Sequence, residues 1–383
     1  MSPSVLFISK PIAPPFHDGS KCLVRDVARN LTRVDPIVLS TPGAPALISA
    51  QGSRAVRSVP AYGVPGAFTP AFSANVRAAS WVLARSRASV WHFVFAPNPR
   101  TSSAGRWLRR LRRTPVVQTI ASPPRNFLDP EALFFGDVLV AQSAWTRQEV
   151  QASYAALGLT APQVVVIPPP VPDLELPSAA QIDDVRRELE LLPGQRYLLY
   201  PGDLETSSGA ETTAALAERL SGVPNDTLIV FAYRRKTPRA AELALGLAAR
   251  LPRARTRFIE NCPHILALVA GAEAVLFPVD DLWGKVDLPI VLLEAMALGV
   301  PVLALDQGPL KDLGGVVKIA TLSAEAWLSE VLALLGDDER RRSVVASQRA
   351  SLELRHRAAC VARAYEDLYL ELYARTNARR SVR

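Results

Sequence analysis

The sequence has few cysteines, and their positions exclude some kinds of site. Its 383 residues include three cysteines, Cys22, Cys262 and Cys360, which are odd in number, far apart and never in a C-x-x-C pair. This pattern argues against a disulfide framework and against a structural zinc site. It predicts buried thiols in a reducing compartment.

Long apolar runs are also missing. No uninterrupted apolar stretch approaches the roughly 18 to 20 residues of a membrane-spanning helix. The first residues, M-S-P-S-V-L-F-I-S, lack the basic region and apolar core of a signal peptide and instead predict a first strand. We therefore expect a cytoplasmic protein, whose membrane contact, if there is any, would be peripheral and at the inner surface.

The charge balance favours anionic partners. The net charge is +8 and the isoelectric point is near 9.7, which suits nucleotide diphosphates, anionic lipids or nucleic acid. No nucleic-acid-binding motif and no aromatic platform among basic residues are present, so nucleic acid is not expected.

Length and composition predict two α/β domains. A chain of 383 residues with 49% hydrophobic and 21% charged residues has enough apolar mass for two cores. A proline-rich segment at 168–177, P-P-P-V-P-D-L-E-L-P, is typical of an interdomain linker. We expect a first domain at 1–172, a second domain at 173–351, and a final segment at 352–383 whose helix returns to the first domain.

The stretch Gly284–Asp312 predicts a strand–helix–strand unit together with the apolar run before it. Ala272–Pro278 is typical of a buried strand, an apolar helix follows with Pro289 in its first turn and Gly299 just past its end, and Val300–Leu305 predicts the next strand.

The apolar helix carries one carboxylate, Glu294, which needs partners if it is buried. It could be a capping or ion-paired glutamate. A ligand-binding role is favoured because Lys285 and Asp287 precede the helix and Asp306–Asp312 follows the next strand. Those loops lie at the carboxyl ends of adjacent strands, where open α/β sheets bind ligands.

The run L-L-E-A-M-A-L-G-V-P-V-L-A resembles the E-A-M-A-x-G-x-P-V signature of GT-B glycosyltransferases, in particular the retaining GT4 family, or glycosyl transferases group 1. The resemblance implies an α/β fold of two Rossmann-like, doubly wound parallel-sheet domains facing across a cleft. It also implies that Glu294 binds the ribose hydroxyls of a nucleotide-sugar donor.

The sequence departs from the family pattern eight positions before Glu294, where the usual glutamate is replaced by Val286. Charged residues flank this position in a K-x-D-x-P form that looks like a divergent branch of the family. We assign the catalytic contribution at the sugar or diphosphate to Lys285 and Asp287.

The loop after the first strand is a second candidate site. Strand, glycine-containing loop and helix together form a common phosphate- or sugar-binding arrangement, and relatives carry a G-G pair here. Here the corresponding residues are Asp18, Gly19, Ser20 and Lys21. An ordinary turn capped by Asp18 or Ser20 is the alternative. Thr119 is assigned to the same first-domain cleft, although the T-x-H of relatives reads Thr119-Ile120-Ala121 here.

The second domain departs from the family pattern in the loop that binds the donor diphosphate in relatives. Relatives have G-R-x-x-x-x-K-G; Gly202 and Gly209 match it, but Asp203 and Ser208 replace the basic residues. We expect compensation from a basic cluster after the next strand, since guanidinium groups suit phosphate oxygens. A solvated basic turn is the alternative. The predicted donor-binding residues are Glu294, Arg234, Arg235, Lys236, Gly202, Gly308 and Asn261.

Three further segments complete the predictions. The basic stretch Arg106–Arg113 predicts a helix with Trp107, Leu108 and Leu111 on one face and arginines on another, which could contact an anionic membrane or be a solvated face. His92 is interpreted as a core residue. Leu352–Tyr373 predicts one long helix, followed by a disordered basic tail.

The resemblance implies a retaining, hexosyltransferase-like enzyme of polysaccharide biosynthesis, acting on a glycan, lipid-linked or small-molecule hydroxyl. No metal site and no cofactor are expected, because the aspartate pairs 183–184, 280–281 and 337–338 do not form the D-x-D site of the other glycosyltransferase fold. The alternatives are a catalytically degenerate GT-B protein acting as a nucleotide-binding or interaction module, and a nucleotide-sugar epimerase.

Overall fold

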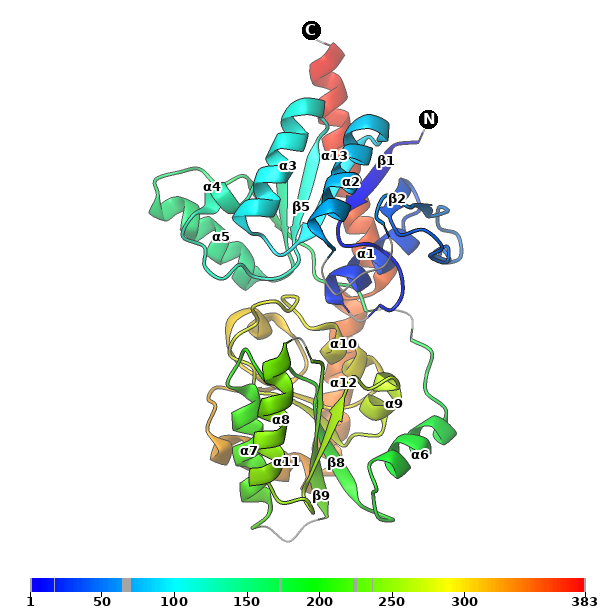
Figure 1. Cartoon of the computed structure of the whole chain (residues 1–383). Helices are drawn as coiled ribbons and strands as arrows, with labels where there is room; N and C mark the ends of the chain where they lie inside the picture. Colours follow the sequence, from blue (N-terminus) through cyan, green and yellow to red (C-terminus); the bar gives the residue numbers. More distant parts are fainter. Residues whose placement is uncertain are drawn as a thin grey trace. The chain divides into compact units, whose positions relative to one another are not determined.

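The chain forms two compact units. The computed structural model describes residues 2–16, 18–63, 70–171, 174–222, 226–235 and 237–381. Unit 1 comprises Met1–Pro172, Trp283–Leu288 and Arg355–Arg383, and unit 2 comprises Asp173–Leu282 and Pro289–Leu354 (Figure 1). The short segment Trp283–Leu288 therefore packs with the first part of the chain, although it lies in the second half of the sequence.

Unit 1 is built on a parallel sheet with helices on its faces. In the described residues the strand order is β3-β2-β1-β4-β5-β6-β7, which places the reversal of strand order between β1 and β4. Its elements are β1 (Ser4–Ile8), α1 (Gly19–Arg29), β2 (Asp35–Leu39), β3 (Arg57–Val59), α2 (Phe72–Arg85), β4 (Val90–Phe95), α3 (Pro99–Arg112), β5 (Val116–Ile120), α4 (Pro130–Leu133), β6 (Val138–Ala141), α5 (Ala144–Ala156), β7 (Gln163–Val166) and α13 (Ala358–Ser381).

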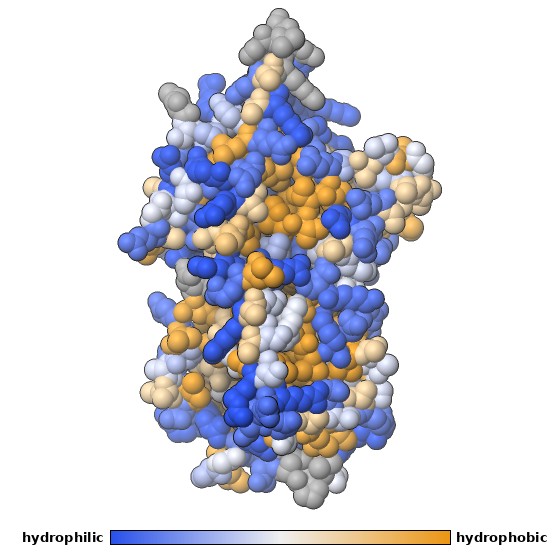
Figure 2. All heavy atoms as spheres, turned by 180° about the vertical axis from the view of Figure 1, so that it is seen from behind, coloured by the Kyte–Doolittle hydropathy of each residue, from blue (hydrophilic) through white to orange (hydrophobic). Residues whose placement is uncertain are grey.

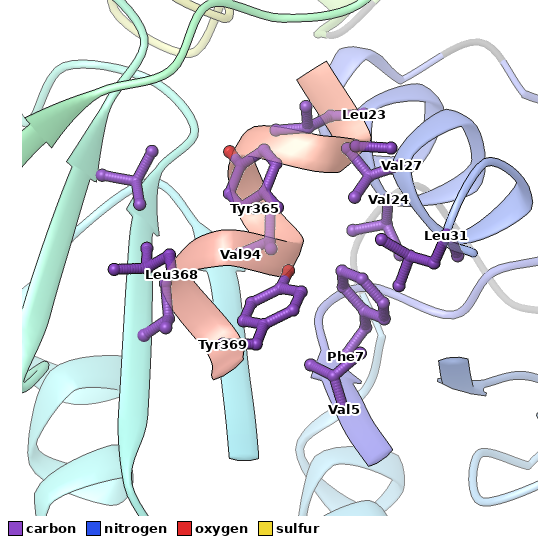
Figure 3. Packing of buried hydrophobic residues seen from close by; sticks show 14 of the residues in the cluster. Val5, Phe7, Leu23, Val24, Val27, Leu31, Val94, Tyr365, Leu368 and Tyr369 are labelled. Atoms are coloured by element: carbon purple, nitrogen blue, oxygen red, sulfur yellow. The ribbon is translucent and has the colours of Figure 1, made fainter. Parts of the chain in front are cut away.

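The two faces of this sheet are covered by different helices. Helices α2 and α3 lie side by side in front of the sheet in Figure 1, and Arg112 of α3 donates to the carbonyl of Leu83 in α2. On the other face α13 packs against α1 and the strands (Figure 3), where Tyr365 and Tyr369 are fully buried. The C-terminal helix is thus part of the core of unit 1.

A buried carboxylate attaches α13 to the end of α1. Glu366 is 1% exposed, and its carboxylate accepts hydrogen bonds from the backbone amides of Thr32 (2.6 Å), Arg33 (2.5 Å) and Val34 (3.3 Å). These amides follow α1 directly, so one side chain provides partners for three backbone groups of the turn.

Unit 2 has a second parallel sheet, with the order β10-β9-β8-β11-β12-β13 in the described residues. Its elements are α6 (Ala179–Glu188), β8 (Arg196–Tyr200), α7 (Gly209–Leu220), β9 (Thr227–Tyr233), α8 (Pro238–Arg250), β10 (Thr256–Glu260), α9 (Ile265–Ala270), β11 (Ala274–Phe277), α10 (Ile290–Ala297), β12 (Val302–Leu305), the 3₁₀ helix η1 (Gly308–Asp312), β13 (Val317–Ile319), α11 (Ala324–Gly336) and α12 (Asp338–Arg355). The strand–helix–strand unit around Glu294 is confirmed as β11, α10 and β12.

The predicted single helix over 352–373 is wrong in its limits. Helix α12 ends at Arg355, and α13 begins at Ala358 and continues to Ser381, through most of the tail that was expected to be disordered. The break is held by the proline-rich segment: His356 Nδ1 lies 2.8 Å from the carbonyl oxygen of Pro169, and the amide of Val171 donates to His356 O at 2.8 Å. Residues 172 and 173, where the linker boundary was predicted, lie outside the described residues.

The surface is mixed in character. Figure 2 shows the side opposite to Figure 1, on which both units expose hydrophilic residues with apolar areas among them. No helix among the described residues is long and apolar enough to cross a membrane.

Candidate functional site

The loop after β1 ends in a capped helix N-terminus. Asp18 Oδ1 accepts hydrogen bonds from the amides of Ser20 (2.9 Å) and Lys21 (3.3 Å), and its Oδ2 lies 2.6 Å from Lys10 Nζ. Burial raises the pKa of Asp18, but the charge of Lys10 and these hydrogen bonds outweigh burial and hold the pKa below its usual value. The carboxylate occupies the position that a bound anion would take at the start of α1.

Lys21 stabilises the same loop. Its Nζ donates to the carbonyl of Ala13 at 2.8 Å, and burial lowers its pKa although Asp18 opposes the shift. The alternative interpretation of this loop, a βα turn capped by its own aspartate, describes what the side chains do in this structure.

The segment Trp283–Leu288 lies directly on this turn. A Cβ atom built on Gly19 would come within 2.7 Å of Val286 Cγ1, so only a glycine leaves room for the valine. The structure therefore brings together two predicted groups that are 265 residues apart, the loop 18–21 and the residues around position 286.

Asp287 is buried against the start of α5. It is fully inaccessible, and its Oδ2 accepts from Ser143 Oγ at 2.8 Å. Ser143 is the N-cap of α5, and its Oγ in turn accepts from the amide of Thr146 at 3.0 Å. The predicted catalytic carboxylate thus anchors its segment at a helix N-terminus, whereas Lys285 beside it is half-buried.

Trp283 provides another contact of the segment. The Arg125 guanidinium lies over its ring, 4.0 Å from the centroid, in a cation–π arrangement. Arg125 is in the loop after β5, so the segment contacts loops that follow β1, β5 and β6.

Thr119 lies inside the core of unit 1. Its side chain is fully buried, with Oγ1 2.7 Å from His92 Nε2 and 3.2 Å from the hydroxyl of Tyr365. The other His92 ring nitrogen lies 2.7 Å from the hydroxyl of Tyr369, and burial lowers the His92 pKa to about 3. The prediction of His92 as a satisfied core residue is confirmed. Thr119 belongs to the same core network, with its hydroxyl directed to α13.

In unit 2, the loop after β8 carries a buried aspartate at a position where the family pattern has an arginine. Asp203 is 5% exposed, and its carbonyl accepts from the hydroxyl of Tyr200 at 2.8 Å. Gly202 packs against the same ring, since a Cβ there would lie 2.3 Å from Tyr200 Cζ. Gly202 therefore has a packing role that residue type alone did not reveal.

The N-terminus of α7 is occupied by a carboxylate of this chain. Asp280, from the loop after β11, accepts from the amide of Ser208 (2.8 Å) and from its hydroxyl (2.7 Å). In the sequence, Asp280 stood out only as one of the aspartate pairs that do not form a metal site. Its partner could not be found from the sequence because the two residues are 72 positions apart.

The basic cluster after β9 is partly neutralised. Arg235 pairs with Glu260 at 3.3 Å, both Arg234 and Arg235 are exposed, and Lys236 lies outside the described residues. Asn261 has a left-handed φ of +52° and donates through Nδ2 to Glu260 Oε1 at 3.1 Å. Arg235 and Asn261 thus share the carboxylate of Glu260.

Glu294 and Gly308 follow adjacent strands of unit 2. Glu294 is half-buried in α10, for which no capping side chain occurs among the described residues. Gly308 begins η1 after β12 with φ +54°, and a Cβ there would meet nothing within 4 Å. In the described part of the chain no group of three or more His, Cys, Asp or Glu side chains could hold a metal ion.

The chain is similar to a known family over part of its length. Residues 181–350 match the sequence profile of the family described as "Glycosyl transferases group 1". No curated protein matches the chain in sequence.

Solved structures match nearly the whole chain. Anabaena Alr3699/HepE, in complex with UDP and glucose, is 15% identical with a TM-score of 0.68, covering 96% of this chain and 99% of that one. Sucrose-phosphate synthase from Thermosynechococcus elongatus is 18% identical with a TM-score of 0.72, covering 97% and 99%. WaaG, a glycosyltransferase involved in lipopolysaccharide biosynthesis, is 18% identical with a TM-score of 0.61, covering 95% and 99%.

These likenesses and the two parallel-sheet units define the fold as GT-B. The stretch that matches the family profile, residues 181–350, lies almost entirely in unit 2.

Proposed function

We propose that the protein is a retaining glycosyltransferase that binds a nucleotide-sugar donor on unit 2. The observation that carries the proposal is the pair of turns at the carboxyl ends of β11 and β12, where α10 presents Glu294 and η1 begins at Gly308. The family match over residues 181–350 and the fold shared with HepE, whose structures contain UDP and UDP-glucose, support it.

The proposed diphosphate position follows from where the chain's own acids lie. The start of α7 is taken by Asp280, and at the start of α8 the amide of Thr237 donates to Glu205 at 3.2 Å. Helix α10 has no capping side chain among the described residues. Because free amides and the helix dipole attract anions, α10 is the more favourable place for the diphosphate.

The residues then take the following roles. Glu294 accepts hydrogen bonds from the ribose hydroxyls, and the open turn at Gly308 lets backbone amides approach the sugar. Arg234, Arg235 and Lys236 of the second domain stabilise the departing diphosphate, a task that cations can perform electrostatically. Lys285 keeps the catalytic role at the sugar or diphosphate that the sequence suggests. Asp287 is buried, so we now assign it to holding the segment that carries Lys285.

The acceptor is a hydroxyl group of a glycan, a lipid-linked saccharide or a small molecule, and the reaction takes place in the cytoplasm. The donor-side cations replace a metal in this proposal, and no cofactor takes part. The GT4 type and a hexosyl donor remain the assignments that the E-A-M-A-L-G-V-P-V signature suggests.

The test is calorimetric binding of UDP, GDP, ADP and their sugar conjugates to wild type, Glu294→Ala and Glu242→Ala. Glu242 is an exposed glutamate of α8 and serves as the matched control. We expect one nucleotide to bind, with Kd raised at least about tenfold by Glu294→Ala through loss of charged hydrogen bonds and unchanged by the control. Equal binding by all three proteins would refute the Glu294 assignment.

A catalytically degenerate GT-B binding protein is the second candidate. The two basic positions of the relatives' G-R-x-x-x-x-K-G pattern favour this candidate. One is the buried Asp203 here, and the other is Ser208, which donates to the carboxylate of Asp280. Turnover separates the two: a protein that binds the nucleotide-sugar but neither transfers nor hydrolyses the sugar in an acceptor screen is the binding module.

A further inference from the structure

Arg125 is an arginine whose guanidinium contacts an aromatic ring and no acid. It lies in the stretch from 36 to 128, which contains twelve arginines and no acidic residue. Its side chain is exposed, and the guanidinium lies 4.0 Å from the centroid of the Trp283 ring. Among the described residues this guanidinium has neither a hydrogen bond nor an ion pair. Its N–H groups are therefore available to water or to a ligand.

The arginines of α3, in the same stretch, serve the fold instead. Arg106 donates to the backbone carbonyls of residues 131 and 132, and Arg109 forms an ion pair with the aspartate at 137. The apolar face that was predicted for this helix is wrong in one member: Leu108 is buried in the core, whereas Trp107 and Leu111 are exposed. These arginines thus attach α3 to the rest of unit 1, a role that Arg125 does not have.

The loop that carries Arg125 is held in place by its own side chains. Asn126 Oδ1 accepts from the amide of Leu128 at 3.2 Å, which closes a turn directly after Arg125. The ring of Phe127 meets the ring of Trp145, in the first turn of α5, edge-on with centroids 6.1 Å apart. Because the loop is already ordered, Arg125 loses little conformational freedom when a ligand binds.

Trp283, the ring beneath Arg125, is fixed from the other side. It begins the segment Trp283–Leu288, in which Asp287 accepts from Ser143 Oγ, at the start of α5, at 2.8 Å. Lys285 adds a positive charge to the same segment. Trp283 itself is 42% exposed, so part of its ring is accessible. The segment, the loop after β5 and the start of α5 therefore contact one another in pairs.

We infer that Arg125 binds an anionic group of the acceptor, a carboxylate or a phosphate, and that the acceptor is an acidic saccharide. The inference rests on the proposed function, in which unit 2 holds the donor and the second substrate falls to unit 1. The guanidinium fork matches the paired oxygens of either anion, and stacking on Trp283 fixes the plane of the fork. The exposed part of the indole ring provides an apolar surface for the sugar.

The acids near this arginine do not compensate its charge. Asp287, in the segment, is buried and bonded to Ser143. Asp129, at the end of the loop, caps α4 by accepting from the amide of Ala132 at 3.0 Å. An anion beside Arg125 therefore gains the attraction of a cation that has no ion pair among the described residues.

The experiment is calorimetric titration of the full chain, without nucleotide, with glucose, glucose 6-phosphate, glucuronate and inorganic phosphate. It is repeated with Arg125→Gln, which removes the charge, and with Arg125→Lys, which keeps the charge and removes the fork. Arg110→Gln is the matched control, because Arg110 is also an exposed arginine of unit 1 without a partner among the described residues.

We expect at least one of the two acidic sugars to bind at least about tenfold more tightly than glucose, and the tighter of the two identifies the anion. Arg125→Gln should raise its Kd at least about fivefold, Arg125→Lys should raise it less, and Arg110→Gln should leave it within about twofold of wild type. The inference is overturned if neither acidic sugar binds more tightly than glucose, or if Arg125→Gln and Arg110→Gln have equal effects. Inorganic phosphate that binds as tightly as glucose 6-phosphate would also overturn it, because the sugar would then make no contact.

This test and the test of the donor site fail separately. A protein that binds a nucleotide through Glu294 but prefers neither acidic sugar keeps the proposed donor site and loses this inference. A protein that binds an acidic sugar through Arg125 but binds no nucleotide keeps the anion site and loses the proposed function.

Discussion

At the scale of single residues, three helix starts near the predicted sites carry a carboxylate of the same chain. Asp18 lies at α1, Asp287 at α5 and Asp280 at α7. Asp18 and Asp280 accept from backbone amides that would otherwise need water or a ligand, whereas Asp287 accepts from the hydroxyl of the N-cap Ser143. These acids stabilise the fold and leave fewer helix starts available to a bound phosphate.

The contact between Gly19 and Val286 can be measured by a double-mutant cycle. Gly19→Ala places a methyl group against Val286 Cγ1 and should lower the free energy of unfolding by about 1–3 kcal/mol. Val286→Ala alone should cost about 1–2 kcal/mol, since it removes buried methyl groups.

The double variant Gly19→Ala/Val286→Ala should be more stable than the sum of the single effects by at least about 1 kcal/mol, because the smaller side chain makes room for the methyl. Urea denaturation of the four proteins checks this. Strict additivity would mean that the two residues do not touch.

Asp18 should make the free energy of unfolding depend on pH in the acidic range. Its pKa is lowered in the folded state, so its contribution is present above the unfolded pKa and is lost as the pH falls through the folded value, below the usual 3.8. Asp18→Ala should reduce stability at pH 7 by about 1–2 kcal/mol through loss of the cap and the Lys10 pair.

Thermal melting of wild type and Asp18→Ala between pH 7 and pH 3 tests this effect. The difference between the two proteins should shrink below about pH 4, as the wild-type carboxylate takes up its proton. A difference that stays constant down to pH 3 would contradict the lowered pKa.

At the scale of elements, α13 is bound to unit 1 by an apolar stripe and one carboxylate. Figure 3 shows Tyr365, Leu368 and Tyr369 among residues of α1, β1 and β4. Glu366 was not singled out from the sequence, because nothing in the sequence near it reveals the amide groups at 32–34 that it binds.

Replacing Glu366 should show how much the attachment of α13 contributes to the free energy of unfolding. Glu366→Ala leaves the amides of residues 32–34 without their buried acceptor and should cost about 2–4 kcal/mol of unfolding free energy. Glu371→Ala, on the same helix, removes only a solvent-exposed pair with Arg375 and should cost under about 0.5 kcal/mol. Chemical denaturation that gave equal costs for the two variants would argue against the buried attachment.

At the scale of the whole molecule, the proposed donor site predicts which backbone amides exchange more slowly when a nucleotide binds. The helix starts that already hold a carboxylate of the chain predict which amides do not change. In hydrogen–deuterium exchange, the nucleotide that binds should slow exchange in the peptide covering α10 and in that covering 306–312. The start of α7 should change little, because Asp280 already holds the amide of Ser208. Protection centred on α7 would place the diphosphate there and reject the α10 position.

Much of the architecture could be predicted from local pattern. The first residues predicted a strand that is observed as β1, and β11, α10 and β12 were predicted from apolar periodicity with a closing glycine. The short edge strands β3 and β13 were not predicted. Each has three residues, which are too few to show an alternating hydrophobic pattern. The helix break at His356 was missed because its cause is the distant Pro169 carbonyl.

The sequence by itself determined the two-domain α/β plan, the E-A-M-A-L-G-V-P-V helix and the acid-free stretch from 36 to 128, since periodicity, signature and composition are properties of neighbouring residues. Tertiary structure alone decided that Trp283–Leu288 packs on Gly19 and Ser143, that Asp287 is buried, and that Asp280 occupies the start of α7. The physical reason is that hydrogen bonding and burial depend on which groups folding brings within about 3 Å, and these partners are 72 to 267 residues apart in the chain.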